Sequence, residues 1–200
     1  MKSENDFKTI EKRVQNIINQ VSDRYISNKL MDAVILIIWL KRINPKILLE
    51  LGTGHGGSGK LIMSELPNIE FHTIDNGHGK HISEEAVGEF LPDGAHKYYN
   101  NIYEDLDKLL KKIKPDTIYI DLPNQSQGQI DWLFKSFHLY NVEWIVLHNS
   151  HKKHYRAYLE NNKYYEELYY LPKLYNKPKS EKGRKTISIG LSVFRIKDEY

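Results

Sequence analysis

The stretch 47-ILLELGTGHGGSGKL-61 decides how the rest of the chain is interpreted. It begins with a short, mostly apolar run typical of a buried strand, and glycines then follow at close intervals up to Gly59. A strand that ends in a glycine turn and leads into a helix lets the backbone approach an anionic group closely. Three patterns of ligand-binding loop fit these letters, so the surrounding residues must distinguish them.

The first pattern is G-x-x-x-x-G-K, read from Gly54, which is close to a nucleotide phosphate-binding loop. Such a loop needs Ser or Thr after the lysine to hold Mg²⁺, but Leu61 follows Lys60. A hydrophobic strand that ends in Asp121 would suit a nucleotide site, although strands of this kind are common in doubly wound folds. This interpretation therefore lacks its magnesium ligand.

The second pattern is G-x-G-x-x-G, read from Gly52, which is the dinucleotide fingerprint. Asp75 closes the next expected strand, where an acid would hold a ribose. Glu50 remains unexplained, because a carboxylate just before the turn adds negative charge where a pyrophosphate would cross. The fingerprint on its own is degenerate.

The third pattern is E-x-G-x-G-x-G, read from Glu50, which is typical of S-adenosylmethionine sites. This molecule carries a sulfonium, an ammonium and a carboxylate, and no phosphate. Glu50 suits the cationic part, and the glycine turn with the following helix N-terminus suits the carboxylate. Asp75 can accept hydrogen bonds from both ribose hydroxyls. This interpretation alone gives every charged group a role.

Strands and helices alternate along most of the chain. We expect strands at 46–51, 70–75, 96–99, 117–122, 143–148, 165–171 and 186–196, and helices at 57–66, 103–113, 129–139 and 151–161. This order predicts an α/β fold with a doubly wound, Rossmann-like sheet, mostly parallel, with helices on both faces. The last two strands are joined by a polar loop without a helix, so we expect an antiparallel last strand.

Two helical stretches precede the first strand. We predict a helical lead at 1–44 packed on an S-adenosylmethionine-binding domain at 45–200, together forming one structural domain. The apolar run at 33–40 is far shorter than the ~20 residues of a membrane helix. The charged N-terminus does not resemble a secretory signal. We therefore expect a cytoplasmic protein without a membrane partner, in which the second helix could supply a homodimer face.

Composition sets further bounds. At 200 residues with 40% hydrophobic content, the chain can bury one core. Since it has no cysteine, disulfides, thiolate zinc sites and cysteine nucleophiles are excluded. A formal charge of +3 permits an anionic partner without requiring one.

Five motifs, in order, resemble those of class I S-adenosylmethionine-dependent methyltransferases. They are LLELGTGHGGS (48–58) as motif I, FHTID (71–75) as motif II, DTIYID (116–121) and EWIVLHN (143–149) as the fourth and fifth strands, and GLSVFRI (190–196) as the closing strand. The likeness spans about 27–196. It is nearest to the small-molecule O-methyltransferase-like branch, whose glycine loop often ends G-G-S, as Gly56-Gly57-Ser58 does here.

The resemblance implies methyl transfer from S-adenosylmethionine, most readily to an oxygen of a small molecule. The cofactor would lie across the carboxyl ends of the first strands. The residues that it implies for cofactor binding are Glu50, Gly52, Thr53, Gly54, Gly56, Gly57, Ser58, Asp75, Asn76, Asn101, Ile102 and Asp121.

Asp121 and His148 are the candidate catalytic residues, because they end the fourth and fifth expected strands, where an open sheet binds ligands. Asp121 could be a base, a metal ligand or a structural carboxylate. His148 could be the general base or a partly buried histidine bonded to backbone. Metal-dependent relatives bring further carboxylates, whereas here Asn149 follows His148, so a divalent metal requirement stays open. The spacing of His148, His151 and His154 argues against a three-histidine site.

Two alternatives to a small-molecule enzyme also stay open. DLPN (121–124) partly resembles the DPPY motif of nucleic-acid methyltransferases, but Asn124 cannot stack on a base, and the basic loop 177–185 could touch phosphate. Asn149 would also suit a catalytically inactive methyltransferase-like binding protein. We further hypothesise that His78 or His81 reaches the cofactor pocket from the long loop after the second strand.

Overall fold

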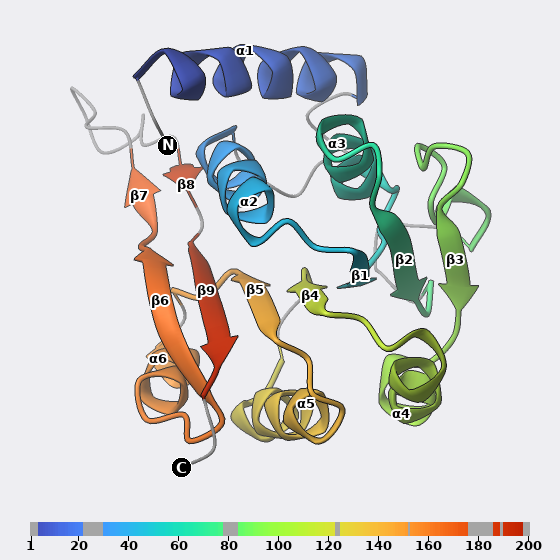
Figure 1. The fold of residues 1–200 in the computed structure, drawn as a ribbon, viewed down its shortest axis with the longest axis vertical. Helices are drawn as coiled ribbons and strands as arrows, with labels where there is room; N and C mark the ends of the chain where they lie inside the picture. Colours follow the sequence, from blue (N-terminus) through green and yellow to red (C-terminus); the bar gives the residue numbers. More distant parts are fainter. Residues whose placement is uncertain are drawn as a thin grey trace.

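The computed structural model describes residues 4–21, 30–77, 84–122, 125–151, 153–175, 186–188 and 190–197 (Figure 1). The helices are α1 (Glu4–Val21), α2 (Leu30–Ile43), α3 (Gly57–Glu65), η1 (Glu84–Ala86), α4 (Ile102–Ile113), α5 (Gln127–Leu139) and α6 (Lys153–Leu159). The strands are β1 (Ile47–Leu51), β2 (Glu70–Asp75), β3 (His96–Tyr99), β4 (Thr117–Ile120), β5 (Trp144–His148), β6 (Tyr165–Leu171), β7 (Leu174–Tyr175), β8 (Thr186–Ser188) and β9 (Leu191–Ile196).

The main sheet has seven strands in the order β3-β2-β1-β4-β5-β9-β6. The pairs from β3 to β5 are parallel, whereas β9 runs antiparallel to both β5 and β6. The mostly parallel sheet with an antiparallel last strand is therefore confirmed. The strand order reverses at β1, between β2 and β4, and in open α/β sheets such a switch point is where ligands bind.

Helices cover both faces of this sheet, as predicted. Figure 1 shows α1, α2 and α3 on one side and α4, α5 and α6 on the other. Successive strand residues serve the two layers alternately: Leu48 packs with α2 and α3, and Leu49 packs with α4 and α5. Glu50 follows the side of Leu48, which directs its carboxyl group toward α3.

The apolar run of α2 is buried within the chain. Val34, Leu36 and Ile37 are at most 1% exposed and pack between the sheet and the residues of α1. These three side chains are therefore covered by the same chain, and a homodimer through the second helix stays a prediction. No described helix is both long enough and apolar enough to cross a membrane.

The strand expected at 186–196 is divided in two, which the sequence analysis missed. β8 pairs with β7 in a separate two-stranded sheet, and β9 begins only after Gly190. Gly190 has φ +94°, and a Cβ atom there would lie 3.1 Å from the backbone nitrogen of His151. A close approach in the left-handed region interrupts the strand at this glycine.

Candidate active site

The turn after β1 has a backbone that only glycine adopts readily. Gly52, Gly54 and Gly56 have φ values of +99°, +51° and +86°. A Cβ atom at Gly52 would lie 2.5 Å from the carbonyl oxygen of Asp121, and one at Gly56 would lie 2.8 Å from a side-chain carbon of Leu91. The glycines therefore let the turn fit between the end of β4 and the segment that follows η1.

Asp75, at the end of β2, holds this turn in place. Its Oδ2 accepts a hydrogen bond from the Gly54 N–H at 3.0 Å, and its Oδ1 accepts one from the Gly77 N–H at 2.8 Å. A carboxylate has about four acceptor positions, so Asp75 can still accept from the hydroxyls of a ribose. Asn76 stands between Asp75 and Gly77 in the chain, at the same strand end.

Glu50 is fully buried beneath the turn. It accepts hydrogen bonds from the hydroxyl of Ser58, in the first turn of α3, and from the hydroxyl of Thr73 at 2.8 Å. The hydroxyl groups of Thr53 and Thr73 are hydrogen-bonded, with their oxygens 2.7 Å apart, which extends the network into the glycine turn. Burial raises the pKa of Glu50 to about 8, because its hydroxyl partners offset the loss of solvation only partly.

Asp121 and His148 lie side by side, as their positions at adjacent strand ends predicted. His148 Nδ1 is 2.7 Å from Asp121 Oδ1, and on its other side His148 Nε2 is 3.6 Å from Asp32 Oδ2. The latter contact is an ion pair, longer than a hydrogen bond. The side chains of His148 and Asp32 are 0% exposed and that of Asp121 is 8% exposed.

The two carboxylates fix the charge of His148. Burial disfavours the imidazolium, but Asp121 and Asp32 outweigh it and raise the pKa of His148 to about 9. A protonated imidazole has no lone pair with which to accept a proton. The paired carboxylates therefore favour a protonated His148 bonded to Asp121, and its role as a general base stays a prediction.

Asp32 was missed in the sequence analysis, although a signal was present. It stands directly before the apolar run of α2, and a carboxylate there is buried with the helix. A buried charge needs a charged or hydrogen-bonding partner, so the position of Asp32 indicated a distant cation. The sequence did not identify His148 as that partner, because the two are more than 100 residues apart.

The remaining predicted cofactor residues lie where β1 and β3 lead into helices. Gly57 and Ser58 begin α3, and Gly56 precedes it as an N-cap without any side-chain hydrogen bond. Asn101 caps α4 by accepting the Tyr103 N–H at 3.1 Å. Ile102, the first residue of α4, is 5% exposed and packs in the core.

Among the described residues, the only three metal-binding side chains whose ligand atoms lie within 4.8 Å of one another are Glu70, His72 and His96, at the other end of the sheet strands. Asp121 does not belong to this group, and a metal at Asp121 stays an open prediction. His148 lies on β5 while α6 begins only at Lys153, so the three histidines from His148 do not share a helix. His78, His81, the Pro123-Asn124 part of DLPN and the basic loop 177–185 lie outside the described residues.

Comparison with known proteins supports the architecture. No family model matches the chain. A methyltransferase of Podospora anserina, solved with bound SAH, superposes with a TM-score of 0.61 at 15% identity, covering 96% of this chain and 88% of that chain. A Staphylococcus aureus protein assigned as a caffeoyl-CoA O-methyltransferase gives 0.59 at 17% identity, with coverage of 96% and 92%. An O-methyltransferase from Bacillus cereus, in complex with SAH, gives 0.55 at 13%, with coverage of 94% and 90%.

The chain has the methyltransferase fold. The likeness covers 94–96% of this chain and 88–92% of the other three, so it is not confined to the glycine turn. Identities this low establish architecture, and the chemistry must be argued from the site itself.

Proposed function

We propose that the protein transfers a methyl group from S-adenosylmethionine to an oxygen of a small molecule. The observation that supports this proposal is the group of acidic side chains around the glycine turn, at the carboxyl ends of β1, β2 and β4. Glu50, Asp75 and Asp121 meet there. Glu50 is protonated below about pH 8 in the ligand-free protein, and the carboxylates of Asp75, Asp121 and Asp32 still outnumber the single positive charge of His148. Two structures of this fold, from Podospora anserina and Bacillus cereus, were solved with SAH.

The residues present fit this cofactor better than they fit a nucleotide. An excess of carboxylate favours a sulfonium and an ammonium, and it would repel the phosphates of ATP or NAD⁺. At the same place, the N-terminus of α3 lacks a side-chain cap at Gly56. Its N–H groups suit the one carboxylate of S-adenosylmethionine.

The roles of the residues follow from their positions. S-adenosylmethionine, when bound, supplies a methyl group that its sulfonium already activates, so the protein must mainly align the acceptor and exclude water. We assign Asp75 to the ribose hydroxyls and Asp121 to the cofactor or the acceptor. His148 and Asp32 hold Asp121 in position. Glu50 supports the turn from below and supplies negative charge near the cationic part of the cofactor.

A catalytically inactive binding protein is the second candidate. The observation that favours it is the engagement of Asp121 by His148, which leaves His148 unsuited to remove a proton from an acceptor. Binding of the cofactor is common to both candidates, whereas release of S-adenosylhomocysteine is expected only from an enzyme.

Isothermal titration calorimetry against S-adenosylmethionine, S-adenosylhomocysteine, ATP·Mg²⁺ and NAD⁺ tests which cofactor the protein binds. We expect binding of the first two alone, with Asp75→Ala at least about 10-fold weaker because two backbone N–H groups and the ribose lose their acceptor. Binding of ATP or NAD⁺ instead would overturn the proposal. Release of S-adenosylhomocysteine is then measured with a panel of phenols and caffeoyl-CoA; no release with any of them would favour the inactive binder.

A further inference from the structure

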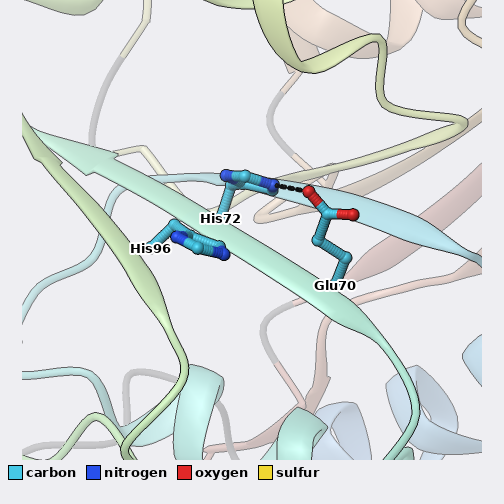
Figure 2. Close-up of side chains that lie close together, drawn as sticks. All are labelled: Glu70, His72 and His96. Atoms are coloured by element: carbon cyan, nitrogen blue, oxygen red, sulfur yellow. Dashed lines mark hydrogen bonds and ion pairs between the residues drawn. The ribbon is translucent and has the colours of Figure 1, made fainter.

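Two histidines and a glutamate meet at the amino ends of β2 and β3, the opposite end of these strands from the proposed cofactor site. His72 is the register partner of His96 across the β2–β3 pair. Glu70 is two residues before His72 on the same strand, so its side chain points to the same face of the sheet. Figure 2 shows the three side chains turned toward one another.

The three side chains are already close in space. Their potential ligand atoms lie within 4.8 Å of one another. His72 Nε2 is 2.8 Å from Glu70 Oε1, and the rings of His72 and His96 stack with centroids 4.6 Å apart. His72 is 5% exposed, whereas Glu70 and His96 face solvent.

We propose that Glu70, His72 and His96 bind a divalent transition-metal ion of the zinc type. Imidazole nitrogen and carboxylate oxygen are the ligands that zinc takes in proteins that lack thiolates. Tetrahedral coordination with bonds of about 2.1 Å places ligand atoms about 3.4 Å apart. The exposed side chains of Glu70 and His96 can rotate to close the difference, and water completes the coordination.

A neighbouring side chain orients the buried ligand. His72 Nε2 donates its N–H to Glu70 in the metal-free chain, and Nδ1 is 3.2 Å from the hydroxyl of Tyr98. When a metal takes the place of the Nε2 proton, the Tyr98 hydroxyl can accept an N–H bond from Nδ1 and hold the ring in position. Burial lowers the pKa of His72, an effect that the contact with Glu70 partly offsets.

The expected role of this ion is structural. β3 is the edge strand of the sheet and is paired only with β2 among the described strands. An ion held by both strands would fasten this edge. Asp75 is five residues along β2 from Glu70, a distance of about 17 Å, so the ion does not reach the reacting atoms.

One nearby positive charge disfavours metal binding at this site. Lys112 of α4 lies with its ammonium 5.5 Å from the ring centroid of Tyr98, and its charge acts on His72. A positive charge at this place weakens the binding of a cation. Removing it should strengthen metal binding, a response that a merely structural histidine pair would not produce.

The test is calorimetric titration of the purified full chain with Zn²⁺, with the metal content after dialysis as a second measurement. We expect one ion per chain and an affinity at least about 100-fold lower in His96→Ala and Glu70→Gln, because a lost ligand costs more than a lost outer partner. Both residues are exposed, so these variants should fold. His138→Ala, in a histidine of α5 remote from this cluster, is the control and should bind as the wild type does.

Lys112→Gln is the variant in which zinc binding should become stronger. It should bind Zn²⁺ several-fold more tightly than the wild type, and Zn²⁺ should raise the Tm of the wild type but not of His96→Ala. Zinc binding that survives in both His96→Ala and Glu70→Gln, or no retained zinc in the wild type, would overturn the proposal. The outcome is independent of S-adenosylmethionine binding, which none of these variants should change.

Discussion

Gly52 is the residue at which the turn tolerates least change. Replacing it by alanine would place a Cβ atom 2.5 Å from the backbone oxygen of Asp121, at a φ of +99° that alanine avoids. We expect Gly52→Ala to lower the free energy of unfolding by at least about 2 kcal/mol and to abolish binding of S-adenosylmethionine. Urea denaturation and calorimetry measure the two effects.

Gly128 provides the matched control. It lies in the first turn of α5, and a Cβ atom there would meet nothing within 4 Å. Gly128→Ala should therefore change stability by less than about 1 kcal/mol, in the stabilising direction, since alanine favours a helix. Equal losses in the two variants would show that the backbone of the turn is not what constrains Gly52.

Glu50 should make cofactor affinity depend on pH. The pKa of this carboxyl group is raised to about 8, so below that pH the ligand-free protein holds a proton that a bound cation would displace. We expect the affinity for S-adenosylmethionine to increase between pH 6 and pH 8. In Glu50→Gln the affinity should be lower at pH 8 and nearly constant across this range.

Calorimetry in buffers of different ionisation enthalpy measures the proton released in this step. S-adenosylhomocysteine, which has no sulfonium charge, is the internal control and should show a weaker pH dependence than S-adenosylmethionine. An affinity for S-adenosylmethionine that does not change from pH 6 to pH 8 would contradict a role for Glu50 near the cation.

For individual residues, the sequence predicted which side chains come together at the site, but not which of them form hydrogen bonds or ion pairs. Glu50, Asp75, Asp121 and His148 were identified because each ends a strand, and strand ends of a parallel sheet share one edge. The partners of Glu50 and His148 depend on side-chain directions and on helix packing. Neither the Ser58–Glu50 contact nor the Asp32–His148 pair follows from spacing alone.

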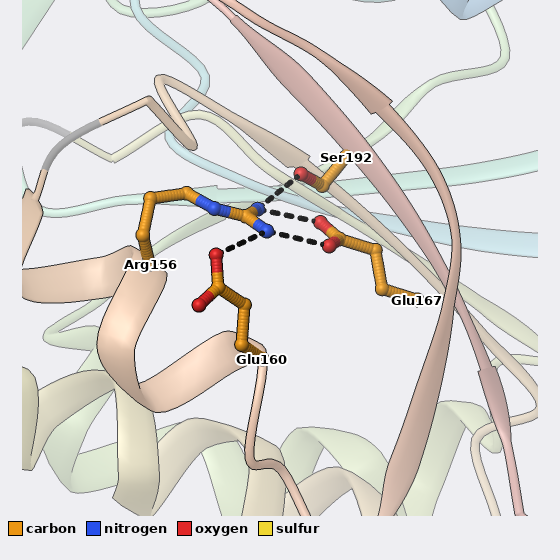
Figure 3. A network of polar contacts seen from close by, with 4 residues as sticks. All are labelled: Arg156, Glu160, Glu167 and Ser192. Carbon is orange, nitrogen blue, oxygen red and sulfur yellow. Dashed lines mark hydrogen bonds and ion pairs between the residues drawn. The ribbon is translucent and has the colours of Figure 1, made fainter.

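Among the elements, α6 is held on the sheet by the packing of Tyr155 and Leu159 in the core and by one arginine. Arg156 donates two hydrogen bonds of 2.7 Å to the carboxylate of Glu167 on β6, and Figure 3 shows it also reaching Ser192 on β9 and Glu160 at the end of α6. Its guanidinium group lies 4.0 Å from the ring centroid of Tyr170. The planar fork of arginine makes these contacts together, which a lysine ammonium cannot do.

Arg156→Lys should therefore loosen α6. We expect a loss of about 1–3 kcal/mol in the free energy of unfolding, because the Glu167 pair is only 16% exposed on each side and its second hydrogen bond is lost. Urea denaturation measures it. Arg195→Lys is the control: its pair with Glu143 is about half exposed and 3.6 Å long, and its loss should cost less than about 0.5 kcal/mol.

Strands bounded by polar turns were predicted closely, whereas element ends that depend on a single tertiary contact were not. β2, β3 and β6 have the expected bounds, because each is a short run between polar turns. The helix expected at 151–161 is shorter at both ends and begins only at Lys153. Asn149, whose φ is +61°, and the packing of Gly190 against His151 shape the intervening turn, and neither effect is visible in hydrophobic periodicity.

For the molecule as a whole, alternating strands and helices were enough to predict the sheet and its two helical layers. The antiparallel position of β9 followed from the absence of a crossover helix before it. The small β7–β8 sheet could not be foreseen, because strands of two and three residues leave almost no pattern. The predicted division at residue 44 stays a prediction, although α2 packs in the same core layer as β1.

The buried charges should make the stability of the whole protein fall as pH rises. In the folded protein the pKa of Glu50 is about 8 and that of His148 about 9, both above the ordinary values of 4.5 and 6.5, so the folded chain holds protons that the unfolded chain has released. Stability therefore decreases with pH wherever the folded state binds more protons. Between pH 6.5 and pH 9 we expect the ligand-free protein to lose a few kcal/mol, since each pKa unit corresponds to about 1.4 kcal/mol.

Urea denaturation at intervals from pH 6.5 to pH 9 measures this slope, and Glu50→Gln separates its two sources. The variant cannot titrate at position 50, so it should lose less stability up to pH 8, while the loss that His148 causes continues to pH 9. Saturating S-adenosylmethionine should also flatten the slope, because a bound cation favours the ionised Glu50 in the folded state. A stability that rises with pH across this window would mean that Glu50 and His148 do not both hold their protons in the folded, ligand-free protein.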